Sequence, residues 1–294
     1  MPRRRLIGVK SAAPALAAAA LLVLLAGCAA TPSDEVTWTV HDWGTEFAGN
    51  SEAGPAFDYQ LGGGYEPPAG AVLVVRDRTD EPAPGLQTIC YVNAFQSQPG
   101  EADLWLDEHP DLILRGADGE PVIDENWPDE MLFDTSTEAN RAELAEVVGG
   151  WIDGCAADGF LGVEFDNLDS FLRSQGALTD ADNFALAATL VERVHSNNMA
   201  AAQKNAAEFA EQGSSEIGFD FAITEECYRW AERSAYMDAY GANVYNIEYV
   251  DDLRGSVEQT CNDIGAIAPA TIFRDRDLVT PDDPAYHLEI PLQR

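Results

Sequence analysis

Short apolar runs recur along the chain from residue 57 onward, and turn signals or helical patterns separate them. Apolar runs of this length, bounded by polar segments, are typical of buried β-strands. Eight strands are expected on this basis. They cover residues 57–61, 71–75, 88–92, 161–165, 199–203, 219–224, 244–247 and 266–273.

Helical patterns lie between the later strands. One begins at the capping box Thr135-x-x-Glu138, a second near Thr179, and a third spans about Cys227–Tyr240 and stops at Gly241. Strands that alternate with helices over this length predict an α/β fold, a single-domain (β/α)8 TIM-like barrel over residues 57–294.

The first two connections are short for helical crossovers. Residues 62–70 and 76–87 offer little more than turns, whereas a helical crossover usually needs a dozen residues or more. We therefore expect short or degenerate first crossovers. A doubly wound sheet is the alternative.

The N-terminus has the pattern of an export signal. The basic residues Arg3, Arg4, Arg5 and Lys10 precede an apolar run over 12–25, and Leu25-Ala26-Gly27-Cys28 follows. Residues 1–28 are therefore predicted to be a lipoprotein signal peptide whose lipobox leaves Cys28 lipid-modified. Residues 29–56 form a tether and N-terminal extension. The protein is expected to be extracellular and held to the membrane through its lipid anchor alone; secretion with Cys28 removed is the alternative.

The chain is strongly acidic. It has 51 acidic and 17 basic residues, a formal net charge of −34, and loss of residues 1–27 would make it about −38. No basic stripe remains to meet phosphates, so nucleic acid is not expected as a partner. A cationic substrate would be attracted. Adaptation to a salty habitat would give the same composition.

Four cysteines remain besides Cys28. An even number in an exported protein predicts disulfides, and three pairings are open. No Cys/His zinc spacing and no EF-hand loop is found, so neither a metal nor another cofactor is expected. The sequence contains no G-x-S-x-G motif, so a serine hydrolase of that type is not expected.

Polar side chains follow four of the expected strands, 161–165, 199–203, 219–224 and 244–247. Catalytic groups of α/β barrels are found at such strand ends. Asp166 alone could be a helix cap, and Lys204 with Glu248 could be a structural ion pair. Lys204 is also the only lysine after the signal segment. Four such strand ends at one rim favour a functional site. The residues are Glu164, Asp166, Asn167, Asp169, Gln203, Lys204, Asn205, Glu225, Glu226, Glu248 and Tyr249.

Two carboxyl groups that flank a cleft are the minimum apparatus for cleaving a glycosidic bond. One must be protonated and the other ionised, which burial and neighbouring charges can arrange. Aromatic side chains near the same rim could stack on sugar rings or belong to the core. These are Tyr91, Trp105, Trp127, Tyr245 and Tyr249.

Six motifs occur in an order that resembles glycoside hydrolase family 114, the endo-α-1,4-polygalactosaminidase family, particularly its actinobacterial branch. The resemblance implies a TIM-like barrel and hydrolysis of partly deacetylated α-1,4-linked galactosamine polymers, a cationic amino-sugar partner that suits an acidic protein. The motifs are Cys90–Ala94, Trp127–Glu130, Gly162–Asp169, Gln203–Asn205, Glu225–Cys227 and Ile247–Tyr249.

The resemblance also implies roles for single residues. Asp166 and Glu225 are the expected catalytic pair, with Asp166 as nucleophile and Glu225 as acid/base, or the reverse. Phe165 and Thr224 depart from the proline and asparagine usual in the motifs. The expected substrate-binding residues are Asp58, Tyr91, Glu164, Asn167, Asp169, Lys204, Asn205, Glu248 and Tyr249.

The same layout favours two disulfides, Cys90–Cys155 beside the third and fourth strands and Cys227–Cys261 between later helices. We expect a monomer. Two other functions stay open: a lipoprotein that binds polysaccharide without cleaving it, and a barrel glycosidase for another amino-sugar polymer.

Overall fold

The computed structural model describes residues 56–264 and 270–291, which belong to one compact unit. The predicted signal peptide with Cys28 and the tether up to residue 55 lie outside the described residues. None of the helices in the described ranges combines the length and the apolar character that a membrane span requires.

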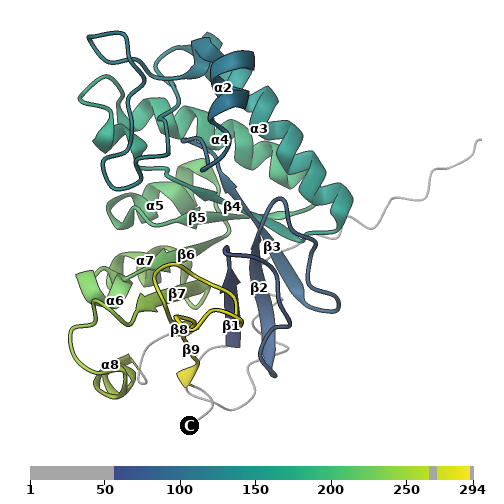
Figure 1. Ribbon diagram of the computed structural model, residues 1–294, viewed down its shortest axis with the longest axis vertical. Helices are drawn as coiled ribbons and strands as arrows, with labels where there is room; N and C mark the ends of the chain where they lie inside the picture. The colour runs from purple at the N-terminus through teal and green to yellow at the C-terminus, as the bar shows by residue number, and fades with distance from the viewer. Residues whose placement is uncertain (1–55, 265–269, 292–294) are drawn as a thin grey trace, which may run out of the picture. The chain divides into compact units, whose positions relative to one another are not determined.

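Eight parallel strands follow one another in chain order around a curled sheet (Figure 1). Each predicted strand is found within a few residues of its expected place, so the α/β barrel order is confirmed. The strands are β1 (Ala56–Gln60), β2 (Ala71–Asp77), β3 (Gln87–Asn93), β4 (Gly162–Asp166), β5 (Ala200–Lys204), β6 (Phe221–Glu225), β7 (Val244–Tyr249) and β8 (Thr271–Arg274).

Side chains join the first and last parallel strands. A short strand, β9 (Leu288–Glu289), pairs antiparallel with β8 and takes the edge that a continuous barrel would offer to β1. Arg274 of β8 instead reaches across to β1, where its guanidinium lies 3.3 Å from Asp58 and donates to the backbone carbonyl of Tyr59. The barrel is therefore completed by a buried ion pair at this seam.

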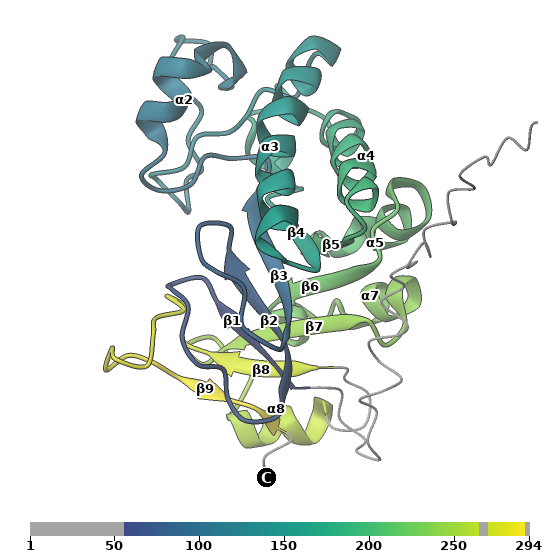
Figure 2. The same cartoon turned by 90° about the vertical axis from the view of Figure 1, so that its right-hand side faces the viewer.

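Helices cover only part of the sheet. The β1–β2 and β2–β3 connections contain no helix, as their length predicts, and α3 and α4 lie side by side along one side of the sheet (Figure 2). The helices are α2 (Ala102–Glu108), α3 (Glu138–Asp158), α4 (Asp180–Ser196), α5 (Ala210–Gln212), α6 (Cys227–Trp230), α7 (Arg233–Tyr240) and α8 (Val257–Ile264).

Two helix predictions need correction. The α3 cap is Thr137, whose hydroxyl accepts from the Asn140 backbone N–H at 3.1 Å, whereas Thr135 donates to Asn183 on α4 at 2.7 Å. The predicted capping box at Thr135 is therefore wrong. The third predicted helix is divided into α6 and α7 because Ala231 adopts φ 62°, a left-handed conformation that ends the first turn.

Alternation along the strands separates an inner from an outer core. Apolar side chains such as Phe57, Ile89 and Phe221 fill the barrel interior, while Val163 and Phe165 pack outward against the helices. On β5 the inward positions before Lys204 are the small Ala200 and Ala202. The barrel interior is therefore apolar along most of the length of the strands, and it becomes polar at their C-terminal ends.

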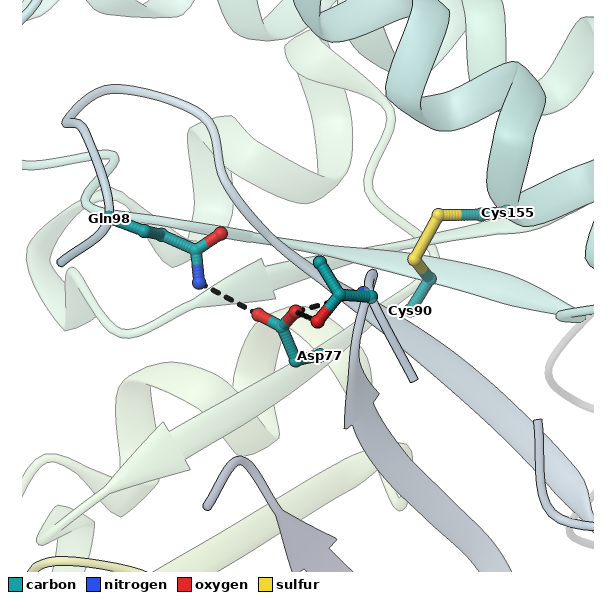
Figure 3. Close-up of a disulfide and its surroundings, with 5 residues drawn as sticks. Asp77, Cys90, Gln98 and Cys155 are labelled. Carbon is teal, nitrogen blue, oxygen red and sulfur yellow. Dashed lines mark hydrogen bonds between the residues drawn. A yellow bond between two sulfur atoms is a disulfide. The ribbon is translucent and has the colours of Figure 1, made fainter. Parts of the chain in front are cut away.

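One predicted disulfide is formed and one is not. Cys90 of β3 is bonded to Cys155 near the end of α3 (Figure 3). The Cys227–Cys261 prediction is wrong: Cys227 is a free thiol in the core under the helices, and burial raises its pKa to about 12. Cys261 packs against a separate hydrophobic cluster around Phe273, so the two side chains lie in different clusters.

Figure 3 also shows how the end of β2 is held. The Asp77 carboxylate accepts a hydrogen bond from the Gln98 amide at 2.7 Å and one from the Thr79 hydroxyl at 2.6 Å. Gln98 belongs to the β3–α3 connection, so this contact joins the C-terminal end of β2 to that connection.

Replacing Cys90 and Cys155 together by serine should lower the free energy of unfolding by about 2–4 kcal/mol, because the bond closes a long loop in the unfolded chain. Their sequence separation is 65 residues. Urea denaturation of both proteins, with and without reductant, measures the difference. Reductant should destabilise the wild type alone; equal midpoints for the two oxidised proteins would contradict the prediction.

Candidate active site

Three carboxyl groups converge on one buried ammonium group at the C-terminal end of the barrel interior. Lys204 Nζ lies 3.2 Å from Asp166 Oδ2, 3.3 Å from Glu225 Oε2 and 3.6 Å from Glu164 Oε1. The Lys204 side chain is 2% exposed. A buried ammonium is tolerated only where opposite charges compensate its lost hydration. The sequence prediction that these residues share one rim is thus matched by their placement.

Each of the three carboxyl groups also accepts a hydrogen bond from one tyrosine hydroxyl. Burial, reinforced by the nearby carboxylates, raises the pKa of all three tyrosines, so they remain protonated donors. The pairs are Tyr59–Glu164 and Tyr91–Asp166, both at 2.8 Å, and Tyr249–Glu225.

Asp166 and Glu164 have opposite protonation tendencies although only Phe165 separates them in the sequence. Burial works against ionisation of Asp166, but Lys204, the Tyr91 hydroxyl and the Asn167 backbone N–H outweigh it and lower the pKa of Asp166. Glu164 is fully buried, and burial raises its pKa to about 8 despite Lys204. At neutral pH the cluster therefore combines an ionised aspartate with a mostly protonated glutamic acid.

Asn205 fixes Glu225 through two contacts. Its amide donates to Glu225 Oε2 at 3.2 Å, and its oxygen accepts from the Glu225 backbone N–H at 2.8 Å. On the far side, the guanidinium of Arg276 stacks over the Tyr249 ring at 4.6 Å. Both carboxyl groups of the predicted catalytic pair are thus held in defined orientations.

The residues after Asp166 form a hydrogen-bonded network around the strand end. This network, called the bracket below, consists of Asn93, Asn167, Asp169 and Arg173. Asn167 adopts φ 64°, donates its backbone N–H to Asp166 Oδ1 at 2.8 Å and its amide to Asn93 at 3.0 Å. Arg173 binds the Asn167 oxygen at 2.9 Å and pairs with Asp169 at 3.0 Å. Asn167 and Asp169 therefore lie beside the cluster and support it from the rim.

Glu130 joins this bracket from the β3–α3 connection. Its Oε2 accepts from Asn93 at 3.1 Å and from Gln96 at 2.9 Å, and burial raises its pKa to about 7. Its motif was noticed in the sequence, but no role was assigned to it. In the described part of the chain no group of three His, Cys, Asp or Glu side chains is arranged to hold a metal ion.

Two predicted substrate-binding residues face away from the cluster. Asp58 pairs with Arg274 on the outer side of β1, and Glu248 accepts from the Tyr228 backbone N–H at 2.7 Å, at the start of α6. Each precedes an inward tyrosine, Tyr59 or Tyr249, so the alternation of the strand turns it outward. For these two positions the sequence interpretation is corrected.

Several residues of the site were missed or were less informative than expected. Tyr59 was missed because the neighbouring Asp58 carried the charge; Asn93 lay inside a quoted motif without a role. Thr224 donates to Asn246 at 3.0 Å and does not enter the cluster, so this departure from the motif leaves it intact. Among the other aromatic candidates, Trp105 and Tyr245 are buried in the core, whereas Trp127 is 56% exposed.

Paired carboxyl groups at the strand ends of an α/β barrel are typical of glycoside hydrolases. The sequence model of glycoside-hydrolase family GH114 matches residues 43–290, and the chain belongs to this family. The protein is accordingly a glycoside hydrolase. No curated protein sequence matches the chain.

Solved structures share the fold. Ega3 from Aspergillus fumigatus, in complex with galactosamine, superposes with a TM-score of 0.65 at 19% identity over 81% of this chain and 95% of that one. The glycoside hydrolase domain of PelA from Pseudomonas aeruginosa, as wild type and as a variant, gives TM-scores of 0.53 and 0.55. Both are 14% identical and cover 78% of this chain and 98% of theirs.

Glu164 should make stability fall as pH rises. Its pKa is about 8 in the folded protein, against an ordinary value of 4.5, so the folded state binds the proton more tightly. Its contribution is fully present below about pH 4.5 and is lost as pH rises through about 8. Glu164→Gln should flatten this decline, on the order of a few kcal/mol, in urea denaturation at pH 5, 7 and 9.

Glu211→Gln, at an exposed position, is the matched control and should follow the wild-type pH dependence. A Glu164→Gln profile parallel to that of the wild type would show that Glu164 is ionised in the folded protein at neutral pH.

Proposed function

We propose that this chain hydrolyses α-1,4-linked galactosamine-containing polysaccharide by a two-carboxylate mechanism, with Asp166 as nucleophile and Glu225 as acid/base. The observation that carries the proposal is the position of Lys204, which lies within 3.3 Å of both carboxyl groups. A single buried cation thus brings together two acids from different strands, at the end of the barrel where active sites are found.

The separation of the two carboxyl groups supports a retaining reaction. Lys204 Nζ lies 3.2 Å from Asp166 Oδ2 and 3.3 Å from Glu225 Oε2, so these oxygens are at most about 6.5 Å apart. Retaining glycosidases place their carboxyl groups at about 5–5.5 Å, and inverting enzymes need about 6.5–9.5 Å to admit water.

The lowered pKa of Asp166 supports its role as the group that attacks in the first step. The ionised Asp166 would attack the anomeric carbon while Glu225 gives its proton to the leaving glycosidic oxygen, which forms a glycosyl–enzyme ester. Glu225 would then remove a proton from water, and attack of that water on the anomeric carbon would release the sugar and regenerate the Asp166 carboxylate.

The substrate class is supported by charge and by the family. A chain with a net charge of −34 attracts a polymer that carries free ammonium groups, and Ega3, which has the same fold, is known in complex with galactosamine. Export, lipidation at Cys28, an extracellular location and a monomeric state are part of the proposal and rest on the sequence.

Asp166→Asn and Glu225→Gln should each reduce turnover by about 10²–10⁴-fold, because each removes a group that reacts with the substrate. New reducing ends released from partly deacetylated galactosaminogalactan measure turnover. The control, Asp238→Asn on the exposed side of α7, should retain wild-type turnover.

Three results would redirect the proposal. Turnover by either variant within about tenfold of wild type would remove that residue from the catalytic pair. A wild type that binds the polymer and releases no ends would be a polysaccharide-binding protein. Turnover only on a different amino-sugar polymer would retain the mechanism and replace the substrate.

Lys204→Met should shift the acidic limb of the pH–rate profile to higher pH. Lys204 lowers the pKa of Asp166 by charge, so its removal raises the pH at which Asp166 ionises. The profile of kcat/KM against pH gives the shift. Arg193→Met, which removes a cation between α3 and α4, should leave the profile unchanged; an unshifted Lys204→Met profile would contradict the assigned role of Lys204.

A further inference from the structure

Glu130 has no part in the two-carboxylate mechanism, yet it is built into the rim beside it. It is 8% exposed, and its backbone lies in the β3–α3 connection, where its N–H donates to the Trp127 carbonyl at 2.9 Å. Its Oε2 is held by Asn93, and Asn93 in turn holds Asn167, the residue after Asp166. Two hydrogen bonds, through Asn93, therefore link Glu130 to Asn167, the residue that follows the proposed nucleophile.

In the part of the chain that the structure describes, no cation compensates the Glu130 carboxyl group. Among the described residues none donates a hydrogen bond to its Oε1, and none forms an ion pair with it. Arg173, which reaches the same bracket, lies 2.7 Å from Asp124 and 3.0 Å from Asp169 instead. A buried carboxylate without a compensating cation is costly, and burial accordingly raises the pKa of Glu130 to about 7.

The other buried acids of the described chain differ from Glu130 in one of two ways. Asp58, Asp124 and Asp275 each pair with an arginine. Glu164 and Glu248 are 0% exposed and cannot meet a ligand without rearrangement. Glu130 combines an uncompensated carboxyl group with remaining access from solvent, which is the property of a ligand-binding acid.

We propose that Glu130 binds the primary ammonium group of a deacetylated amino-sugar unit next to the bond that is cleaved. This inference rests on the proposed function and adds the group that recognises the free amine. An ammonium offers three N–H donors and the missing positive charge, and Oε1 is the open acceptor. An N-acetyl group is neutral and offers one N–H, so it lacks the charge that this position requires.

Glu130→Gln separates this role from simple support of the bracket. The glutamine oxygen can still accept from Asn93 and Gln96, so the hydrogen bonds that position Asn167 are kept while the charge is lost. Glu125→Gln, an exposed neighbour in the same connection, is the matched control. All three proteins are compared on the full chain with Asp166→Asn added, which prevents turnover during binding.

Calorimetry with a galactosamine oligosaccharide and an N-acetylgalactosamine oligosaccharide of equal length measures the effect. Glu130→Gln should weaken binding of the free-amine ligand by about tenfold to a hundredfold and leave the acetylated ligand within about twofold. Without the added Asp166→Asn, Glu130→Gln should raise KM for the deacetylated polymer, with kcat within about twofold.

Equal weakening of both ligands, unchanged binding of both, or no binding of the free-amine ligand by the protein with Glu130 intact would each overturn the proposal. A fall in kcat without a rise in KM would assign Glu130 to positioning. Because the binding experiment needs no cleavage, selective binding in a protein that releases no reducing ends would overturn only the proposed hydrolysis.

Discussion

The site depends on one buried ammonium group. Asp166 and Glu225 come from different strands, and both lie in a partly buried space where unpaired carboxylates would repel each other. Lys204 lies between them and makes this proximity favourable. The small Ala200 and Ala202 below it contribute to the room that the interior needs for the aromatic rings of other strands, so the composition of β5 serves both the core and the site.

The charges of the cluster also fit its proposed chemistry. Glu164 is mostly protonated at neutral pH, so the charge of Lys204 is left to Asp166 and Glu225. In the proposed first step Asp166 is the ionised carboxylate and Glu225 gives up its proton as the glycosidic bond breaks, so negative charge faces the sugar as the oxocarbenium-like transition state gains positive charge. The tyrosine hydroxyls orient the carboxyl groups without adding charge.

The sequence predicted the order of the strands and the rim, and it failed where the face of a strand had to be chosen. Apolar runs locate barrel strands well, but both faces of such a strand are buried, so the run alone does not say which residues point inward. Asp58 and Glu248 were chosen for their charge, whereas the inward residues are their neighbours Tyr59 and Tyr249. The role of Glu130 depends on a long connection that has no periodic pattern.

The misleading charge of Asp58 has a structural reason. Among the residues that the structure describes, no helix covers the outer side of β1 and β2, so polar side chains that elsewhere would lie under a helix are satisfied by loops. Arg76 donates to Gln60 at 3.0 Å and to the Tyr65 carbonyl at 2.7 Å, while Asp58 receives Arg274 from β8. The short crossovers and the side-chain seam are thus one solution: hydrogen-bonded loops and an ion pair replace helices there, and the inward face of β1 remains available to hold Glu164 through Tyr59.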